Sequence, residues 1–378
     1  MFYLFPGSVF RRFYHLFSGI RVCLTAKRAL VFTRLRAQGN RCFTKFKSYK
    51  GRKRRIIMKK FVKILVSSVL VGAMALSMCA CNAAGKKKSN GKIKVGIINN
   101  DPNESGYRTA NDKDMKATFT EANGYEASFA YSLKNDEQIA AAQKFIQDEV
   151  DYLLISAAAT TGWDGVLEQA KKAGIKVILF DRTIDASEDL YEASIVSDMA
   201  KEGDTAVSWL ASQNLPEYKV IHIQGVMGSS AQIGRSDALN KKVAAESNWS
   251  IVQQQTAEWN AETAQQIVQA VIDSGEKFNV IYAENDDMAK GAVQALDKAN
   301  ISHGVGKDVI VMGFDCNKWA LEELLAGNWN YDGQCNPFQA SYINDIIKNG
   351  AKQKTVIMEE KGFDASTITK DDVDKYGI

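Results

Sequence analysis

The chain has 378 residues, 46% of them hydrophobic, and its formal net charge of +4 conceals an uneven distribution. Residues 1–57 carry 15 Lys and Arg and no acidic residue, whereas the chain from Cys81 onward holds 30 basic and 44 acidic residues, a net charge of about −14. The part that folds is therefore acidic, which argues against a nucleic-acid-binding protein.

The basic segment 1–57 has two interpretations. It is either an arm that binds nucleic acid or an upstream stretch translated ahead of a true start at Met58. We favour the second interpretation, because an export signal follows Met58 and would carry such an arm away from nucleic acid. We expect residues 1–57 to be absent from the mature protein.

Residues 58–80 have the three parts of a secretory signal peptide: a basic start, an apolar stretch and small residues at its end. The cysteines at that end indicate a lipoprotein signal. We expect lipidation at Cys81 rather than Cys79, because Ala80 supplies a small residue before the cut and Met78 is bulky. An uncleaved membrane anchor is the alternative, although so short an apolar stretch barely spans a bilayer.

After a flexible linker over 81–91, short apolar runs alternate with helical patterns. Five runs bounded by turn residues predict strands, at 94–99, 125–131, 152–156, 176–181 and 193–197. Between them, apolar residues at three-and-four spacing predict helices, as in 136–148 and 165–173. The repeated order of strand, helix and strand predicts a parallel sheet with right-handed crossovers.

The same alternation begins again past Asp198. Helices are predicted at 200–213, 233–247, 261–273 and 288–299, and strands at 219–225, 249–255, 280–285 and 309–315. Two such units predict an α/β protein with two doubly wound parallel-sheet lobes and a cleft between them. Ligands of such sheets bind beyond the carboxyl ends of the strands, so the loops that follow the strands are the candidate site.

These loops hold the side chains that a sugar requires. They supply guanidinium donors, carboxylate acceptors, amides and aromatic faces: Arg108, Arg182, Arg235, Glu104, Asp181, Asp315, Asn285, Gln334, Tyr107, Trp163 and Trp259. Sugar hydroxyls both donate and accept hydrogen bonds, and the C–H faces of a sugar pack on aromatic rings. Asp181 and Arg182 directly follow a buried strand, where an unpaired charge is costly, so we expect them to lie together.

Several motifs together resemble the periplasmic sugar-binding proteins of ABC importers. They are GYRT (106–109), TTGW (160–163), DRTID (181–185), the turn that ends at 234–235, NDDMAKGAVQAL (285–296) and GFD (313–315). The resemblance begins near Lys92 and is greatest to the galactofuranose-binding branch, with ribose- and galactose-binding proteins as more distant relatives.

The resemblance implies a type I binding-protein fold and one bound monosaccharide. The implied lobes are 92–198 plus about 336–360, and 199–335 plus about 361–378, joined by three hinge strands. The implied sugar contacts are Glu104, Tyr107, Arg108, Asp181, Arg182, Arg235, Trp259, Asn285, Asp315 and Gln334. Gln334 stands where the galactofuranose-binding branch has an acid, and Phe314 and Trp259 also depart from that branch, so galactofuranose, galactose and ribose all stay open.

Other classes of function fit the sequence less well. No G-x-G-x-x-G follows the first strand, and His222 and His303 lack the spacing of metal ligands, so we expect no enzyme, cofactor or metal. Asp286 and Asp287 are expected to cap the helix near Met288. A sugar-responsive repressor requires a helix-turn-helix ahead of the core, where this chain has a signal peptide.

We therefore expect a monomeric receptor, anchored by lipid at the extracellular face of the membrane or in the periplasm. It would deliver a monosaccharide to an ABC transporter permease; the alternative partner is a membrane sensor kinase or chemoreceptor. Cys316 and Cys335, the two cysteines of the folded part, allow either a disulfide or two free thiols.

Overall fold

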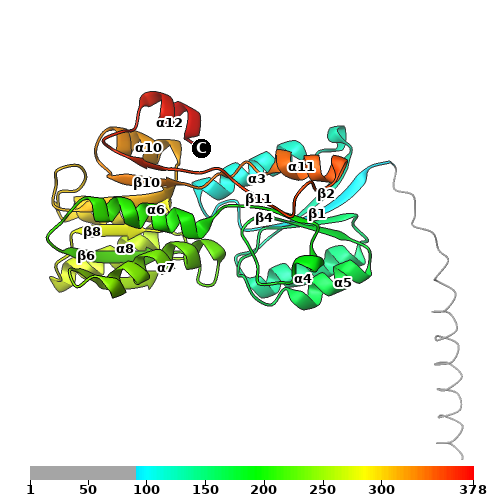
Figure 1. The fold of residues 1–378 in the computed structure, drawn as a ribbon, viewed down its shortest axis with the longest axis horizontal. Helices are drawn as coiled ribbons and strands as arrows, with labels where there is room; N and C mark the ends of the chain where they lie inside the picture. The colour runs from blue at the N-terminus through cyan, green and yellow to red at the C-terminus, as the bar shows by residue number, and fades with distance from the viewer. Residues whose placement is uncertain (1–90) are drawn as a thin grey trace, which may run out of the picture. The chain divides into compact units, whose positions relative to one another are not determined.

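The computed structural model describes residues 91–378, which form two lobes, each built on a six-stranded sheet (Figure 1). The strand order is β11-β5-β4-β3-β1-β2 in the first sheet and β12-β10-β9-β8-β6-β7 in the second. The basic segment, the signal peptide and Cys81 lie outside the described residues. No helix between residues 91 and 378 is long and apolar enough to cross a membrane.

The first lobe is formed by residues 93–196 and by a later segment, 340–357. Its elements are β1 (Ile93–Asn99), α3 (Gly106–Thr118), η1 (Glu121–Asn123), β2 (Tyr125–Tyr131), α4 (Asn135–Gln147), β3 (Tyr152–Ile155), α5 (Asp164–Lys172), β4 (Lys176–Asp181), η2 (Glu188–Leu190), β5 (Ala193–Val196), α11 (Ala340–Asn349) and β11 (Thr355–Ile357). All its strands pair in parallel. Helices α3 and α11 cover one face of the sheet and α4 and α5 the other (Figure 1).

The second lobe repeats this plan. Its elements are α6 (Met199–Ser212), β6 (Tyr218–Gln224), α7 (Ser230–Ala245), β7 (Trp249–Thr256), α8 (Ala261–Ser274), β8 (Val280–Ala283), α9 (Asp286–Lys298), β9 (Ile310–Asp315), α10 (Lys318–Leu325), β10 (Tyr331–Gln334), β12 (Gly362–Asp364) and α12 (Lys370–Tyr376). Only β12 is antiparallel, to β10, among the strands of this lobe. Helices α6 and α7 pack on one face of the sheet, and α8, α9 and α10 on the other.

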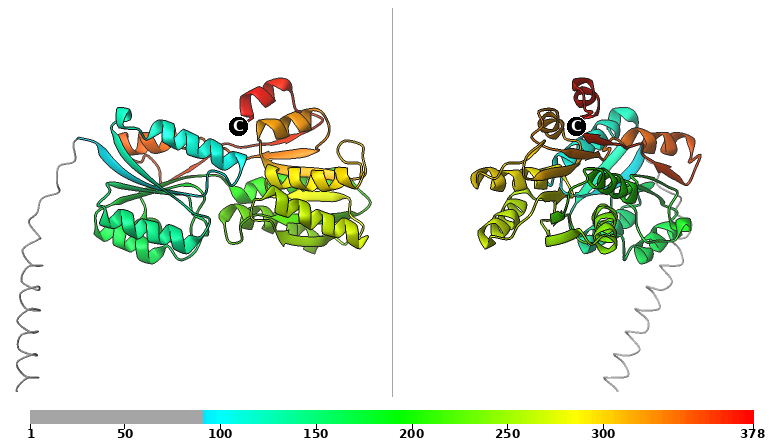
Figure 2. Two further views of the ribbon diagram at one scale, coloured as in Figure 1. Left: turned by 180° about the vertical axis from the view of Figure 1, so that it is seen from behind. Right: turned by 60° about the vertical axis from the view of Figure 1, so that its left-hand side comes forward.

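The chain passes between the lobes three times. The first crossover (197–198) joins β5 to α6, the second (335–339) joins β10 to α11, and the third (358–361) joins β11 to β12. The two lobes are also distinct when seen from behind in Figure 2. The predicted fold class, two doubly wound parallel-sheet lobes, is thus confirmed, with one antiparallel edge strand in the second sheet.

The buried interior explains why the apolar runs form these strands. Strands β1, β3 and β4 are buried on both faces because helices cover both, and their sequences read as nearly continuous runs of Val, Ile and Leu.

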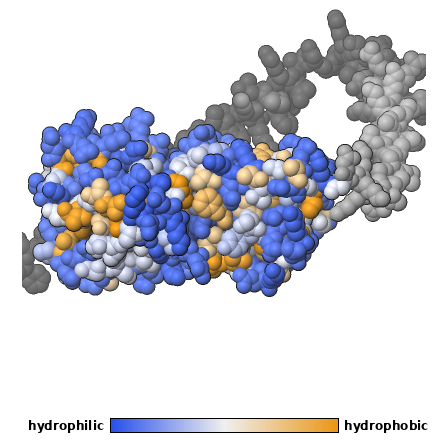
Figure 3. Space-filling view, turned by 90° about the horizontal axis from the view of Figure 1, so that it is seen from above, coloured by the Kyte–Doolittle hydropathy of each residue, from blue (hydrophilic) through white to orange (hydrophobic). Residues whose placement is uncertain are grey.

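The face drawn in Figure 3 is mainly hydrophilic with scattered apolar positions. Cys316 and Cys335 are both buried and free, which resolves the alternative left open by the sequence in favour of two thiols.

Candidate functional site

A pocket lies where the carboxyl ends of the strands of both lobes meet. It encloses about 280 Å³, counting the part that is open to solvent. Nine of the ten predicted contact residues line it: Glu104, Tyr107, Arg108, Asp181 and Arg182 from the first lobe, and Arg235, Trp259, Asn285 and Asp315 from the second. Four of these lie in the loops after β1, β4, β7 and β8, and two are the last residues of β4 and β9. The other three lie in the first two turns of α3 and α7, the helices that follow β1 and β6, so all nine gather near strand ends, as the rule for parallel sheets predicts.

Asp181 is the centre of the first lobe's half of the pocket. Its carboxylate accepts hydrogen bonds from Arg108 Nη2 (2.8 Å), Ser156 Oγ (2.7 Å) and the Tyr107 hydroxyl (2.9 Å). Burial alone would raise the pKa of this carboxyl, but the charges of Arg108 and Arg182 and the hydrogen bonds from Ser156 and Arg108 together hold the pKa below its usual value. Asp181 is therefore an ionised acceptor held in one orientation.

Arg182 is less tightly held than its position beside Asp181 suggests. Its Nε lies 3.7 Å from Asp181 and its Nη2 3.5 Å from Glu104. Within residues 91–378 its one hydrogen bond runs from Nη1 to the Ala157 carbonyl at 3.4 Å. The expected partnership of Asp181 and Arg182 is therefore loose, and Arg108 is the close partner of Asp181. Arg182 keeps donors free to meet a ligand.

The second lobe holds Arg235 against acids. Arg235 lies 2.8 Å from Glu202 through Nε and 2.7 Å through Nη2, and Nη2 also lies 3.6 Å from Asp315. Its Nη1 donates to the Glu284 carbonyl, and its guanidinium carbon lies 4.6 Å from the centre of the Phe314 ring. Burial raises the pKa of Asp315 well above its usual value although Arg235 lies nearby.

Trp259 forms an aromatic wall, and local backbone geometry places it there. Trp259 adopts a φ of 68°, and a Cβ atom on Gly225 would lie 1.9 Å from the indole. Only glycine at 225 therefore leaves room for the ring. The guanidinium carbon of Arg182 lies 5.6 Å from the Trp259 ring centre, so the two lobes meet here through a cation–π contact.

Three pocket side chains carry buried polar atoms without a partner. Among residues 91–378, Glu104 Oε2, Arg108 Nε and Trp259 Nε1 make no hydrogen bond. A buried polar atom without a partner is costly, about 1–3 kcal/mol each. One carboxylate acceptor and two N–H donors are thus available to a small polar ligand in this pocket.

Contacts around the pocket hold the lobes together. The Gly106 amide donates to Asp287 at 3.0 Å, and the Thr160 amide donates to the Gly228 carbonyl at 3.0 Å. Each of these bonds joins the first lobe to the second. These bonds favour the arrangement in which the two halves of the pocket lie together.

Two of the residues considered at the sequence level lie elsewhere. Gln334 lines a different cavity beside the third crossover, while the next residue, Cys335, lines the pocket. Successive side chains of an extended segment point to opposite sides, so a shift of one residue accounts for the difference. Trp163 is fully buried in the first lobe and donates to the Ala159 carbonyl.

The cap of α9 also differs from expectation. Asn285 is the N-cap, accepting from the Met288 amide at 2.9 Å, and its Nδ2 lies 3.4 Å from the Trp259 carbonyl. Asp287 instead accepts from Gly106 across the lobes, and Asp286 is buried against Asn317. Asn285 thus joins the aromatic wall to the start of the helix.

A pair of acids is buried beneath the second lobe's half of the pocket. Asp286 and Asp332 are both fully buried, near Asp287, Asp315 and Cys316. Burial, together with neighbouring acids, raises the pKa of Asp332 to about 8 and that of Asp286 well above its usual value. The stability of the folded state therefore depends on the protonation of this pair.

The sequence analysis missed Ser156 and Glu202, which orient Asp181 and Arg235. Ser156 ends a predicted strand, so the strand-end rule was sufficient to find it. Glu202 lies in the first turn of a helix, where acids are common for reasons unrelated to a site.

Comparisons with known proteins agree with this geometry. Residues 95–354 match the family described as "Periplasmic binding protein domain". The fructose import binding protein FruE of Bifidobacterium longum is 30% identical over 322 residues, which cover 82% of this chain and 95% of that protein. The galactofuranose-binding protein YtfQ of Escherichia coli is 29% identical, over 71% of this chain and 83% of that protein.

A solved structure of a sugar-bound protein is also similar to this chain. The periplasmic binding protein of the arabinose ABC transporter from Shewanella sp. ANA-3, bound to α- and β-L-arabinofuranose, superposes with a TM-score of 0.68. It is 28% identical, and the match covers 75% of this chain and 95% of that chain.

Proposed function

Since the chain belongs to the periplasmic binding protein domain family, whose members bind solutes and are not enzymes, we propose that it captures one free monosaccharide between its lobes and delivers it to an ABC importer. The observation that carries this proposal is the set of unpaired polar atoms beside an indole wall: Glu104 Oε2, Arg108 Nε and Trp259 Nε1.

The chemistry of the pocket suits a sugar. Each sugar hydroxyl can donate to a carboxylate such as Asp181 or Glu104 and accept from a guanidinium such as Arg182. The apolar C–H face of the ring packs on Trp259. Charge alone does not select the ligand, because the three guanidinium groups of the pocket stand against three acidic side chains.

Similar proteins guide the choice of sugars to test. Relatives with the family fold are described as binding fructose, galactofuranose and L-arabinofuranose. We propose a pentose or hexose, with furanose forms first in the panel and galactose and ribose beside them.

Function in this proposal rests on closure of the lobes. Sugar would first bind to one lobe of an open form, and the contacts of the second lobe would then raise the population of the closed form. The interlobe bond from Gly106 to Asp287 supports a closed state of this kind.

We also propose that the protein is a monomer attached to the outer face of the membrane, by lipid on Cys81. Mass spectrometry of the membrane form should find a diacylglyceryl group on Cys81. A group on Cys79, or soluble protein that retains residues 58–80, would contradict this assignment.

Thermal melting with a ligand panel tests the proposed function. A sugar at 100 times its Kd should stabilise the folded protein by about 2.7 kcal/mol, whereas nucleotides and amino acids should leave the melting temperature unchanged. Stabilisation by nucleotides or amino acids and by no sugar would overturn the proposal. If the sugar-bound protein binds a sensor kinase and not a permease, the proposed partner would be wrong, but the proposed sugar binding would stand.

A further inference from the structure

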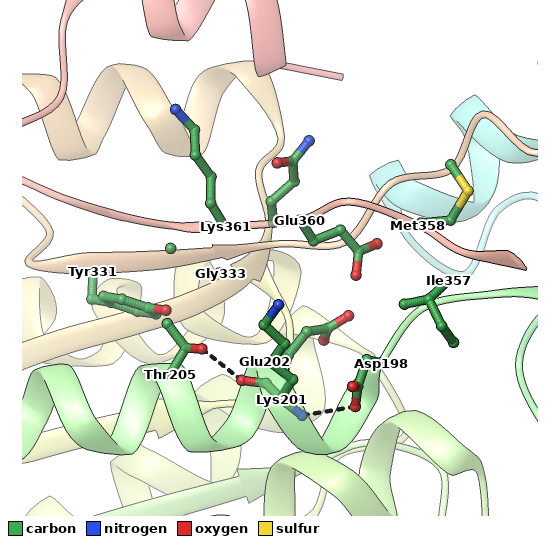
Figure 4. A pocket seen from close by; sticks show the side chains of 12 residues that line it. Asp198, Lys201, Glu202, Thr205, Tyr331, Gly333, Ile357, Met358, Glu360 and Lys361 are labelled. Atoms are coloured by element: carbon green, nitrogen blue, oxygen red, sulfur yellow. Dashed lines mark hydrogen bonds between the residues drawn. The ribbon is translucent and has the colours of Figure 1, made fainter.

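Three possible metal ligands gather where the chain crosses between the lobes. One ligand atom each from Glu202, Cys335 and Glu360 lies within 4.8 Å of the other two. Glu202 and Glu360 also line a cavity of about 420 Å³, counting its open part, beside the crossovers (Figure 4). This cavity is separate from the pocket described above.

The three ligands come from separate segments of the chain. Glu202 is in the first turn of α6, just past the first crossover, while Cys335 and Glu360 lie in the second and third crossovers. Glu360 Oε1 accepts from Ser197 Oγ (2.6 Å) and from the Asn336 amide (2.7 Å). One carboxylate thus already contacts all three crossovers.

One carboxylate oxygen of Glu202 is left unpaired within this cluster, as far as the described residues show. Its Oε2 accepts from Arg235, but its Oε1 is buried and has no hydrogen-bond partner among the described residues, and only 3% of the side chain is exposed. Figure 4 shows the carboxylates of Glu202 and Glu360 turned toward one another, with the ammonium of Lys361 turned away. Glu202 is buried and Glu360 is half-buried, and two acids that face each other there are stabilised by a cation or a proton between them.

We propose that Glu202, Cys335 and Glu360 bind one divalent cation of the zinc class. Zinc accepts thiolate and carboxylate oxygen ligands together, in a tetrahedral set that water can complete. The thiol disfavours Ca²⁺ and Mg²⁺, which prefer oxygen ligands alone. The two carboxylates and the thiolate carry three negative charges. The divalent ion and the adjacent Arg235 together carry three positive charges, so the whole group is neutral.

The cavity gives the cation a route of entry and a place for the completing water. The bound ion would tie the three crossovers together, adding to the contacts of Glu360 with Ser197 and Asn336. Because burial and acidic neighbours raise the pKa of Glu360 and of Cys335, binding should also release protons. Sequence spacing gave no sign of such a site, because its ligands lie far apart along the chain.

Calorimetric titration of the purified protein with ZnCl₂ tests the proposal, with Co²⁺ absorption to report a thiolate ligand. We expect one Zn²⁺ per chain, a thiolate-to-Co²⁺ band, and a melting temperature raised by Zn²⁺. Glu360→Gln and Cys335→Ser should each weaken Zn²⁺ binding by more than the ~10–100-fold that follows loss of an outer partner. Cys316→Ser removes the other buried thiol and should bind Zn²⁺ like the parent.

Two results would overturn the proposal. One is no stoichiometric Zn²⁺ binding by the parent, in which case a proton alone joins the two carboxylates. The other is undiminished binding by both Glu360→Gln and Cys335→Ser, which would place the ion elsewhere. Because the titration contains no sugar, neither result bears on the proposed sugar site. If one variant fails to melt like the parent without metal, the other and the Co²⁺ spectrum decide.

Discussion

Replacing Arg182 with alanine should weaken monosaccharide binding by about thirty- to a thousandfold while leaving the fold intact. Within the described part of the chain this guanidinium makes one long hydrogen bond, to the Ala157 carbonyl, and its nearest carboxylate oxygens lie 3.5 and 3.7 Å away. Its remaining donors are therefore available to the sugar. Loss of one or two charge-assisted hydrogen bonds amounts to about 2–4 kcal/mol, or roughly 1.4 kcal/mol for each tenfold in Kd.

The fold should survive this change because Asp181 retains its close partners. Arg108, Ser156 and Tyr107 still donate to its carboxylate, at 2.7–2.9 Å. Calorimetric titration with the sugar that stabilises the parent most is the assay. Lys171→Ala is the matched control, since it removes an exposed cation paired with Asp189 and should change neither binding nor melting. An Arg182→Ala variant that binds within about threefold of the parent would refute the assignment of this pocket.

Three further predictions concern the aromatic wall, the buried acids and the thiols. Trp259→Ala should weaken binding at least tenfold, about 1.4 kcal/mol, because the indole covers the sugar only when the lobes meet; unchanged titration would contradict this. The pKa values of Asp286 and Asp332 are raised in the folded state, so the stability that their protonated forms contribute is complete below pH about 4. Between pH 5 and 7 the free energy of unfolding should fall by about 1.4 kcal/mol per pH unit for each proton that the folded protein binds and the unfolded chain does not. Denaturant unfolding should show a smaller fall for Asp332→Asn, and an equal fall would exclude the acid pair as its source. A thiol assay on denatured, unreduced protein carrying lipid on its first residue should count two reactive groups, from Cys316 and Cys335, and a count of zero would indicate a disulfide.

The sequence predicted the repeated part of the fold well because period and length were clear there. The predicted strands at 125–131 and 176–181 coincide with β2 and β4, and the predicted helix at 261–273 ends one residue short of α8. The resemblance to periplasmic sugar-binding proteins is confirmed by the family match over 95–354.

Prediction failed where local pattern was weak. Helix α3 begins inside a segment that the sequence analysis treated as a loop, because polar residues dominate its sequence and its mean hydropathy is low. Strands β11 and β12 have three residues each, too few to show a period. Their places at the edges of the two sheets come from long-range pairing, which sequence spacing does not encode.

The candidate site was predicted in outline because strand ends converge in parallel sheets. What the sequence did not show is which acid meets which guanidinium: Arg108, and not Arg182, is the close partner of Asp181. The sequence also did not show that Gln334 lines a different cavity from the other predicted contacts, since a shift of one residue in an extended segment reverses the direction of a side chain.

A crystal structure of the protein with the sugar that stabilises it most tests the central claim most directly. We predict one monosaccharide in the pocket, its ring packed on Trp259. Its hydroxyls should lie within hydrogen-bonding distance of Glu104 Oε2, Arg108 Nε and Arg182. A sugar bound elsewhere, or bound in this pocket with those atoms still unpaired, would contradict the account.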